Sequence, residues 1–148
     1  MSSPRIAFVQ SCWHRDIVDP CRTAFVDRLA ELDIEASRVT CLEVPGAFEL
    51  PLHVKLLAKS GQYDAIVAAG LVVDGGIYRH EFVANAVIDG LMQVQLDTLT
   101  PVLSAVLTPH HFHAGEEHVT FFREHMKVKG REVADACVGT LSSLVRLG

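Results

Sequence analysis

The chain combines 148 residues with a 49% hydrophobic composition, enough for one domain with a full core, so we expect a single domain over residues 1–148. Its formal net charge of −5 argues against nucleic acid as a partner, because no basic excess is present to neutralise phosphates. The N-terminus lacks the apolar region of a signal peptide and no run is as long as a membrane span, which favours a cytoplasmic protein without a membrane partner.

The first third of the chain predicts a strand, a helix and a second strand. Residues 5–11 form an apolar run with β-branched side chains, which is typical of a buried strand. Asp19 and Pro20 predict a helix start, with Asp19 as N-cap and Pro20 at the first helical position, and the helical spacing continues to Leu32. Residues 34–44 predict the second strand.

The rest of the chain continues this alternation. The Pro45-Gly46 pair ends the second strand, and Gly61 is placed to end the helix that follows. Pro51 is compatible with that helix only in its first turn. The later predicted elements are a helix over 47–61, a strand over 63–73, a helix with an apolar stripe from Phe82 to Met92, a strand over 101–107, and two helices over 116–127 and 131–146.

Strands that alternate with helices and are apolar throughout predict the α/β class, with right-handed crossovers and a parallel sheet covered on both faces. In such sheets, ligands bind outside the carboxyl ends of the strands. The segments that follow the four predicted strands are therefore the places to search for a site.

The segments after the first two strands carry candidate binding groups. Trp13 and His14 follow the first strand, where an indole can stack on a planar ring, although a half-buried core aromatic is the plainer interpretation. Ala47, Phe48 and Glu49 stand at a predicted helix N-terminus, whose free N–H groups bind oxygen-rich ligands. Glu49 could accept hydrogen bonds from hydroxyls or simply complement the helix dipole, and spacing alone does not separate these roles.

The segment after the third strand is suited to an anion. Gly75 and Gly76 let the backbone approach a ligand closely, and their amides can form an anion-binding nest. Arg79 adds a permanent cation, and His80 adds a group that titrates near neutrality. The segment therefore predicts a phosphate or other anion site, although most glycine pairs only form turns.

The histidines and cysteines do not predict a metal site. The histidines after the fourth strand lack a metal-binding frame, which favours a polar loop bordering an anionic site; they are His110, His111, His113, His118 and His125. The four cysteines show no CxxC spacing and predict reduced, mostly buried thiols: Cys12, Cys21, Cys41 and Cys137.

Together these segments resemble the 6,7-dimethyl-8-ribityllumazine synthase family. VPGAFELP at 44–51 matches a specific signature of that family, supported by the segments at 63–76, 81–87, 101–108 and 128–130. The resemblance implies a flavodoxin-like three-layer α/β/α subunit with a four-stranded parallel sheet. It also implies homopentamers, some of which pair into decamers or form shells, with sites shared between neighbouring subunits.

The resemblance implies a reaction between two small molecules. The family condenses 5-amino-6-(D-ribitylamino)uracil with 3,4-dihydroxy-2-butanone 4-phosphate, releases phosphate and water, and uses no metal and no organic cofactor. By position, Trp13 looks like the aromatic that stacks on the pyrimidine, and Glu49 resembles the acid that holds ribityl hydroxyls. The other residues implied in binding the uracil substrate are His14, Ala47, Phe48, Leu71, Val72, Val73 and Ser104, and those implied in binding phosphate are Gly75, Gly76, Ile77, His118 and Arg123.

Several positions depart from the family pattern. Arg79 stands where the family has its acid/base histidine, and His80 is displaced by one position. Ile77 replaces a phosphate-binding threonine, and Ser104 replaces a phenylalanine supplied by the neighbouring subunit. Phe121 falls at the nominal position of a phosphate-binding arginine, for which His118 and Arg123 are possible substitutes.

These departures resemble a divergent second type of lumazine synthase, found as decamers in bacteria that carry two copies. We expect a working but slow transferase, because holding the two substrates together supplies most of the catalysis. The alternative is a flavin- or lumazine-binding protein that has lost catalysis. A flavodoxin-like redox protein is disfavoured, because the loop after the first strand lacks a phosphate cradle rich in Ser and Thr.

Overall fold

The structure is a computed structural model that describes residues 3–74, 79–109 and 115–148. Its elements in chain order are β1 (Ile6–Ser11), α1 (Arg15–Glu31), the 3₁₀ turn η1 (Ala36–Arg38), β2 (Val39–Val44), the 3₁₀ turn η2 (Ala47–Glu49), α2 (Leu50–Lys59), β3 (Ala65–Leu71), α3 (His80–Thr98), β4 (Val102–Leu107) and α4 (Glu116–Leu147).

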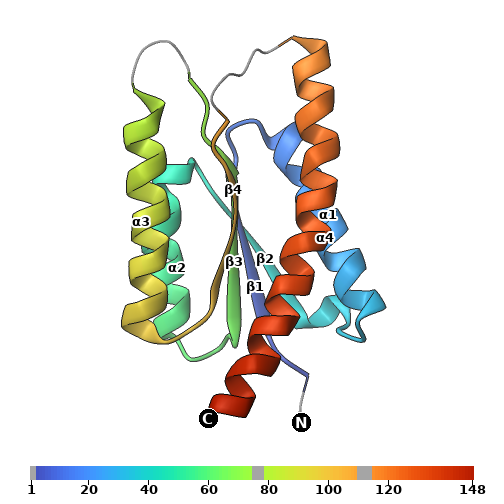
Figure 1. Cartoon of the computed structure of the whole chain (residues 1–148), viewed down its shortest axis with the longest axis vertical. Helices are drawn as coiled ribbons and strands as arrows, with labels where there is room; N and C mark the ends of the chain where they lie inside the picture. The colour runs from blue at the N-terminus through green and yellow to red at the C-terminus, as the bar shows by residue number, and fades with distance from the viewer. Residues whose placement is uncertain (1–2, 75–78, 110–114) are drawn as a thin grey trace.

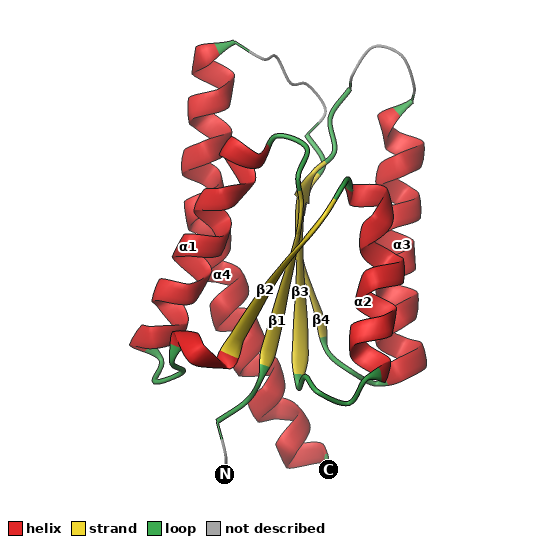
Figure 2. Ribbon diagram, turned by 180° about the vertical axis from the view of Figure 1, so that it is seen from behind, coloured by secondary structure: helices red, strands yellow, loops and turns green. Residues whose placement is uncertain are grey.

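The four strands form one parallel sheet in the order β2-β1-β3-β4. Helices α1 and α4 cover one face of the sheet, and α2 and α3 cover the other (Figures 1 and 2). The predicted α/β class and four-stranded parallel sheet are therefore confirmed. The carboxyl ends of the strands all meet at one edge, which is the upper edge in Figure 1.

The core consists of two apolar clusters, one on each face of the sheet. Phe8 and Phe25 are fully buried in the cluster under α1 and α4, with ring centroids 5.2 Å apart. Leu50 and Val54 are fully buried in the cluster under α2 and α3. Because β1 and β3 are covered on both faces, their residues are buried without alternation, as expected for the central strands of a parallel sheet.

Two local signals were interpreted correctly. Pro51 lies at the start of α2, where its missing N–H has no helical partner to lose. Gly61 has a φ of 72° just beyond the end of α2, a conformation that glycine adopts without the steric cost of a Cβ.

The predicted start of the first helix at Asp19 and Pro20 was wrong. Helix α1 begins at Arg15, so Pro20 lies inside it. A proline here cannot donate to the carbonyl of Asp16 four residues earlier. That carbonyl accepts instead from Arg123 Nε of α4 at 3.3 Å, a contact that helps the helix to tolerate Pro20.

The two predicted C-terminal helices are one helix, α4, because Gly130 does not interrupt it. A Cβ at Gly130 would lie 2.4 Å from the carbonyl oxygen of Cys21 and 2.9 Å from Ala24 Cβ. The glycine therefore permits close packing of α4 on α1.

Strand β2 also differs from the prediction. It begins at Val39 after the 3₁₀ turn η1, and its residues Thr40, Cys41 and Glu43 are exposed. The expectation of a strand that is apolar throughout was wrong here, because β2 is an edge strand.

Candidate functional site

A cavity of ≈ 200 Å³ opens at the carboxyl end of the sheet, on the side of α2 and α3. It joins three of the segments singled out in the sequence: the turns after β1 and β2 and the end of β3. Its lining residues are Trp13, Gly46, Ala47, Phe48, Glu49, Leu71, Val72 and Val83.

Trp13 is held by the connection between β1 and α1. The N–H of Cys12, just before it, donates to the carbonyls of Val44 and Pro45 at 3.0 and 3.3 Å, which ties this connection to the turn after β2. The indole is 56% exposed, so it is a cavity wall rather than a core aromatic. An aromatic face in this position can stack on a planar ring.

Gly46 allows the two turns to approach each other. A Cβ at Gly46 would meet Glu49 Oε2 at 3.1 Å and the Trp13 ring at 3.5 Å. A larger residue would therefore press on the Glu49 carboxylate, while its Cβ would be in ordinary van der Waals contact with the Trp13 ring.

Glu49 is the N-cap residue of α2 and has one visible function in the fold. Its Oε2 accepts a hydrogen bond from the backbone N–H of Gly46 at 2.9 Å, which holds the turn. Glu49 also lines the cavity, and no hydrogen bond to its other oxygen, Oε1, is found within the described residues. Phe48 beside it is 65% exposed, while Ala47 is buried.

The end of β3 supplies the floor of the cavity through Leu71 and Val72. The Val72 N–H already donates to the Leu107 carbonyl at 2.9 Å, so it is not available to a ligand. Val73 does not line the cavity and packs in the cluster under α1 and α4.

Arg79 and His80 lie at the start of α3, one turn before the cavity residue Val83. The Arg79 guanidinium lies 5.6 Å from the centroid of the Phe82 ring, a cation–π arrangement. His80 has 16% of its side chain exposed, and its Nδ1 lies 3.3 Å from Glu81 Oε2. Residues three apart on a helix share a face, so His80 and Val83 lie on the same side of α3.

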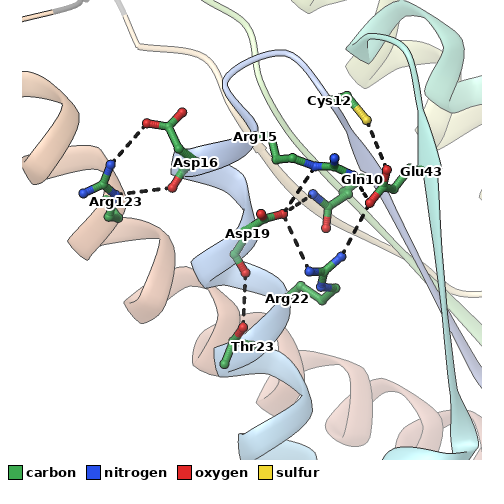
Figure 3. Close-up of polar contacts among 9 residues, drawn as sticks. All are labelled: Gln10, Cys12, Arg15, Asp16, Asp19, Arg22, Thr23, Glu43 and Arg123. Carbon is green, nitrogen blue, oxygen red and sulfur yellow. Dashed lines mark hydrogen bonds and ion pairs between the residues drawn. The ribbon is translucent and has the colours of Figure 1, made fainter.

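Of the predicted phosphate residues, only His118 and Arg123 lie within the described ranges, and neither lines the cavity. Gly75, Gly76 and Ile77 lie outside the described residues. Arg123 does not line the cavity. Its guanidinium contacts Asp16 of α1 twice, with Nε donating to the backbone carbonyl and a second nitrogen lying 3.1 Å from the Asp16 carboxylate (Figure 3). His118 is on the same helix, where its ring lies edge-on to Phe122 with centroids 6.1 Å apart.

His14 and Ser104 also lie outside the lining of the cavity. His14 has a φ of 56° and precedes the first residue of α1, a left-handed conformation that costs a non-glycine residue roughly 1–2 kcal/mol. Ser104 is exposed on β4, the other edge strand of the sheet, and its Oγ accepts from the Val106 N–H at 3.3 Å.

Two cavity residues were missed from the sequence. Gly46 was interpreted only as part of a turn, and nothing local indicates that an indole packs on it. Val83 follows His80 by three residues in a helical stripe, and this spacing was the available signal.

The predicted burial of the cysteines is confirmed for Cys21 and Cys137, whereas Cys41 is exposed. Burial raises the pKa of both Cys21 and Cys137 to about 12, so these thiols stay protonated near neutrality. Within the described ranges, no three His, Cys, Asp or Glu side chains are grouped so that they could hold a metal ion. His110, His111 and His113 are outside those ranges. No helix in the described part of the chain is long and apolar enough to cross a membrane.

Comparisons with known proteins show the family of this chain. The sequence model of the family described as 6,7-dimethyl-8-ribityllumazine synthase matches residues 3–144. A protein of that name from Rhodococcus erythropolis is 62% identical over 97% of this chain and 92% of its own length. 6,7-Dimethyl-8-ribityllumazine synthase 2 from Pseudomonas syringae pv. tomato is 59% identical over 95% of this chain and 82% of its own length. A synthase 1 from Caulobacter vibrioides is 35% identical over 97% of this chain and 92% of its own length. The chain therefore belongs to the 6,7-dimethyl-8-ribityllumazine synthase family.

Proposed function

We propose that this chain condenses 5-amino-6-(D-ribitylamino)uracil with 3,4-dihydroxy-2-butanone 4-phosphate to give 6,7-dimethyl-8-ribityllumazine and phosphate. The observation that carries the proposal is that Trp13, the 47–49 turn and the end of β3 line one cavity, as the sequence predicted. Membership of the family supports the same reaction. A cytoplasmic location is part of the proposal.

The described cavity receives the uracil substrate. The Trp13 indole stacks on the pyrimidine ring, and Phe48 extends the apolar wall. Glu49 Oε1 accepts hydrogen bonds from ribityl hydroxyls while Oε2 keeps the turn closed at Gly46. The carboxylate thus couples ligand binding to the geometry of the turn.

The second substrate lies toward the start of α3. Arg79 stabilises the phosphate, aided by the positive end of α3 and by the backbone of Gly75 and Gly76. Arg79 cannot transfer protons near neutrality because an arginine guanidinium is permanently charged there. His80 is less exposed and lies on the same side of α3 as Val83, which suits it to move protons between the substrates and water.

Positioning carries the larger share of catalysis. Holding two reactants in place supplies roughly 7–11 kcal/mol in favourable cases, whereas an acid/base group adds about 10²–10⁴-fold. A site with Arg79 at the position of the family's histidine therefore turns over slowly but measurably.

The site is completed by a second copy of the chain in a pentamer or in a decamer of two pentamers. Ser104, exposed on the sheet edge, and His118 on α4 are the proposed contributions of the neighbour. Arg123 contacts Asp16 of its own subunit, which disfavours a phosphate role for it there. The higher identity to relatives named synthase 2 than to one named synthase 1 supports the divergent decameric type.

The test is an assay with both substrates that follows lumazine fluorescence and phosphate release. Trp13→Ala should raise the KM for the uracil substrate on the order of tenfold, whereas Trp13→Phe should retain most of the stacking. Arg79→Ala should mainly raise the KM for the butanone phosphate. A correctly assembled protein that releases neither product above the uncatalysed rate would contradict the proposal, and tight riboflavin binding without turnover would favour the binding protein instead.

A further inference from the structure

The connection that carries Trp13 is bound at both of its ends by one carboxylate. Cys12 precedes Trp13, and its Sγ donates to Glu43 Oε2 at 3.6 Å. Arg15 follows His14 and forms an ion pair with Glu43 Oε1 (Figure 3). Each oxygen of Glu43 therefore contacts a different end of the segment 12–15.

A second set of contacts holds the start of α1 to the sheet. Arg22 lies 3.8 Å from both Glu43 Oε1 and Asp19 Oδ1, and Arg15 Nε lies 4.0 Å from the same Asp19 oxygen. Asp19 Oδ1 also accepts from Nε2 of the fully buried Gln10 at 2.8 Å. Gln10 and Glu43 are register partners on β1 and β2, so the network joins α1 to both strands.

Two features of segment 12–15 favour a change of its conformation. His14 at its centre has a φ of 56°, which is unfavourable for a residue with a Cβ, and the Trp13 indole is more than half exposed. Glu43 stands three residues before Gly46, against which the indole packs. Glu43 therefore contacts the segment that carries Trp13, and it also lies next to the turn against which the indole packs.

A contribution to the free energy of unfolding does not sufficiently explain the contacts of Glu43. The side chains of Arg15 and Glu43 are 48% and 42% exposed, and exposed ion pairs contribute little to the free energy of unfolding. Their local effect is different, because the pair restricts a short connection whose conformation sets the direction of one functional ring.

We propose that Glu43, together with Arg15, is a positioning residue that holds segment 12–15 so that the Trp13 indole stays on the cavity wall in the orientation that a pyrimidine ring requires. Glu43 does not line the cavity, so it acts through Trp13 and not by contact with substrate. The consequence for catalysis rests on the proposed function; the effect on Trp13 itself does not.

Tryptophan fluorescence tests the effect on the ring directly, because Trp13 is the only tryptophan in the chain. In ligand-free Glu43→Ala, we expect lower emission anisotropy and stronger acrylamide quenching than in the unaltered protein. With both substrates, we expect the KM for the uracil substrate to rise on the order of fivefold, with the KM for the butanone phosphate unchanged.

Glu31→Ala is the matched control, because it removes a similarly exposed carboxylate that pairs with Arg131 at 2.9 Å, away from the cavity. It should leave Trp13 emission and both KM values unchanged. Arg15→Ala removes the other partner and should reproduce the Glu43→Ala effects. The effect of the double variant should be smaller than the sum of the two single effects, because both variants remove the Arg15–Glu43 pair, while Glu43 also contacts Cys12 and Arg22.

The proposal fails if Glu43→Ala and Arg15→Ala leave the anisotropy and quenching of Trp13 unchanged. It also fails if both KM values and the unfolding midpoint change together, since that pattern indicates a general structural role. If Glu43→Ala does not fold, the same judgement is made on Arg15→Ala, whose substitution lies on an exposed helix surface. Absence of turnover in the unaltered protein would contradict the proposed function alone, and the Trp13 measurements would still decide the role of Glu43.

Discussion

The two helical layers of the subunit differ in whether ion pairs join their helices and in the apolar side chains that they expose. Helices α1 and α4 are joined by ion pairs, with Arg28 and Arg131 2.9 Å from Asp135 and Glu31. Within the described residues, no ion pair links α2 to α3. Large apolar side chains are exposed on these two helices: Leu52, Leu56, Phe82, Ile88, Met92 and Leu96. Helix α4 also exposes large apolar side chains, which are Phe121, Val128, Leu144, Val145 and Leu147.

The difference indicates which side of the sheet needs a partner. Helices α1 and α4 are joined to each other by close backbone packing and by ion pairs, and the exposed large apolar residues of this layer lie on α4 alone. The layer of α2 and α3 leaves apolar surface in water, and such surface favours contact with another protein surface. The cavity lies on this second side, which is why we propose that a neighbouring subunit completes the site.

The largest effect is expected from a substitution that breaks the close packing of α1 on α4. In Gly130→Ala, the new Cβ would meet backbone of α1 at 2.4 Å, so the helices must separate. We expect the free energy of unfolding to fall by about 3 kcal/mol in urea denaturation.

Gly139→Ala is the control for this substitution, because Gly139 lies on the same helix and its added Cβ would meet no heavy atom of another described segment within 4 Å. It should raise stability by about 0.5–1 kcal/mol, since alanine favours the helix more than glycine does. Equal effects of the two substitutions would show that α1 and α4 pack less closely than they do in the structure.

The next effect concerns the apolar surface of α2 and α3. Met92 is 53% exposed, and Met92→Lys should weaken each contact between subunits by about 2 kcal/mol if this surface is the interface. Sedimentation equilibrium should then show smaller assemblies. Ala136→Lys adds the same charge at an exposed position of α4, far along the helix from the proposed interface residue His118, and should leave the assembly mass unchanged. The reverse result would place the main subunit contact at the surface around Ala136.

A smaller effect tests why α1 tolerates Pro20. Arg123→Ala removes the donor to the Asp16 carbonyl and should lower stability by about 1 kcal/mol. In a Pro20→Ala background, the restored N–H can satisfy that carbonyl, so Arg123→Ala should cost less there. Chemical denaturation of the four proteins measures the coupling. A rise in the KM for the butanone phosphate in Arg123→Ala, with no change in stability, would instead support a phosphate role.

The smallest effect comes from the thiols buried between α1 and α4. The pKa of Cys21 and of Cys137 is raised from 9.0 to about 12 by burial, so the unfolded chain releases these protons at lower pH than the folded chain does. Their contribution to stability is therefore constant below about pH 8 and falls as pH rises toward 12. From pH 7 to pH 9, each should account for a loss of about 0.4 kcal/mol.

Denaturation at the two pH values, with Cys137→Ala for comparison, measures this contribution. The variant should be less stable overall but should lose less stability between pH 7 and pH 9. Cys41 is exposed and should react rapidly with a thiol reagent in the folded protein, while Cys21 and Cys137 should not react until the protein unfolds. Rapid reaction of all four thiols would mean that the contact between α1 and α4 opens readily.

The sequence by itself determined the class of fold and three of the segments that meet at the cavity. Continuous apolar runs such as 65–71 encode a buried strand locally, and parallel strands bring their carboxyl ends to one edge. Trp13 and Glu49 could therefore be placed at a common site without coordinates. Gly61 and Pro51 were also interpreted correctly, because their constraints act within one turn of the chain.

Only the tertiary structure decided where local rules are overruled. Pro20 lies inside α1, where Arg123 donates to the carbonyl that the proline cannot satisfy. Gly130 lies inside α4, where it allows the close approach of Cys21. In both cases the contacting residue is about a hundred residues away in the chain. The contacts of Gly46 with Trp13, and of Glu43 with segment 12–15, are of the same kind. Propensity describes what a residue prefers with its neighbours in sequence, whereas these groups are satisfied by neighbours in space.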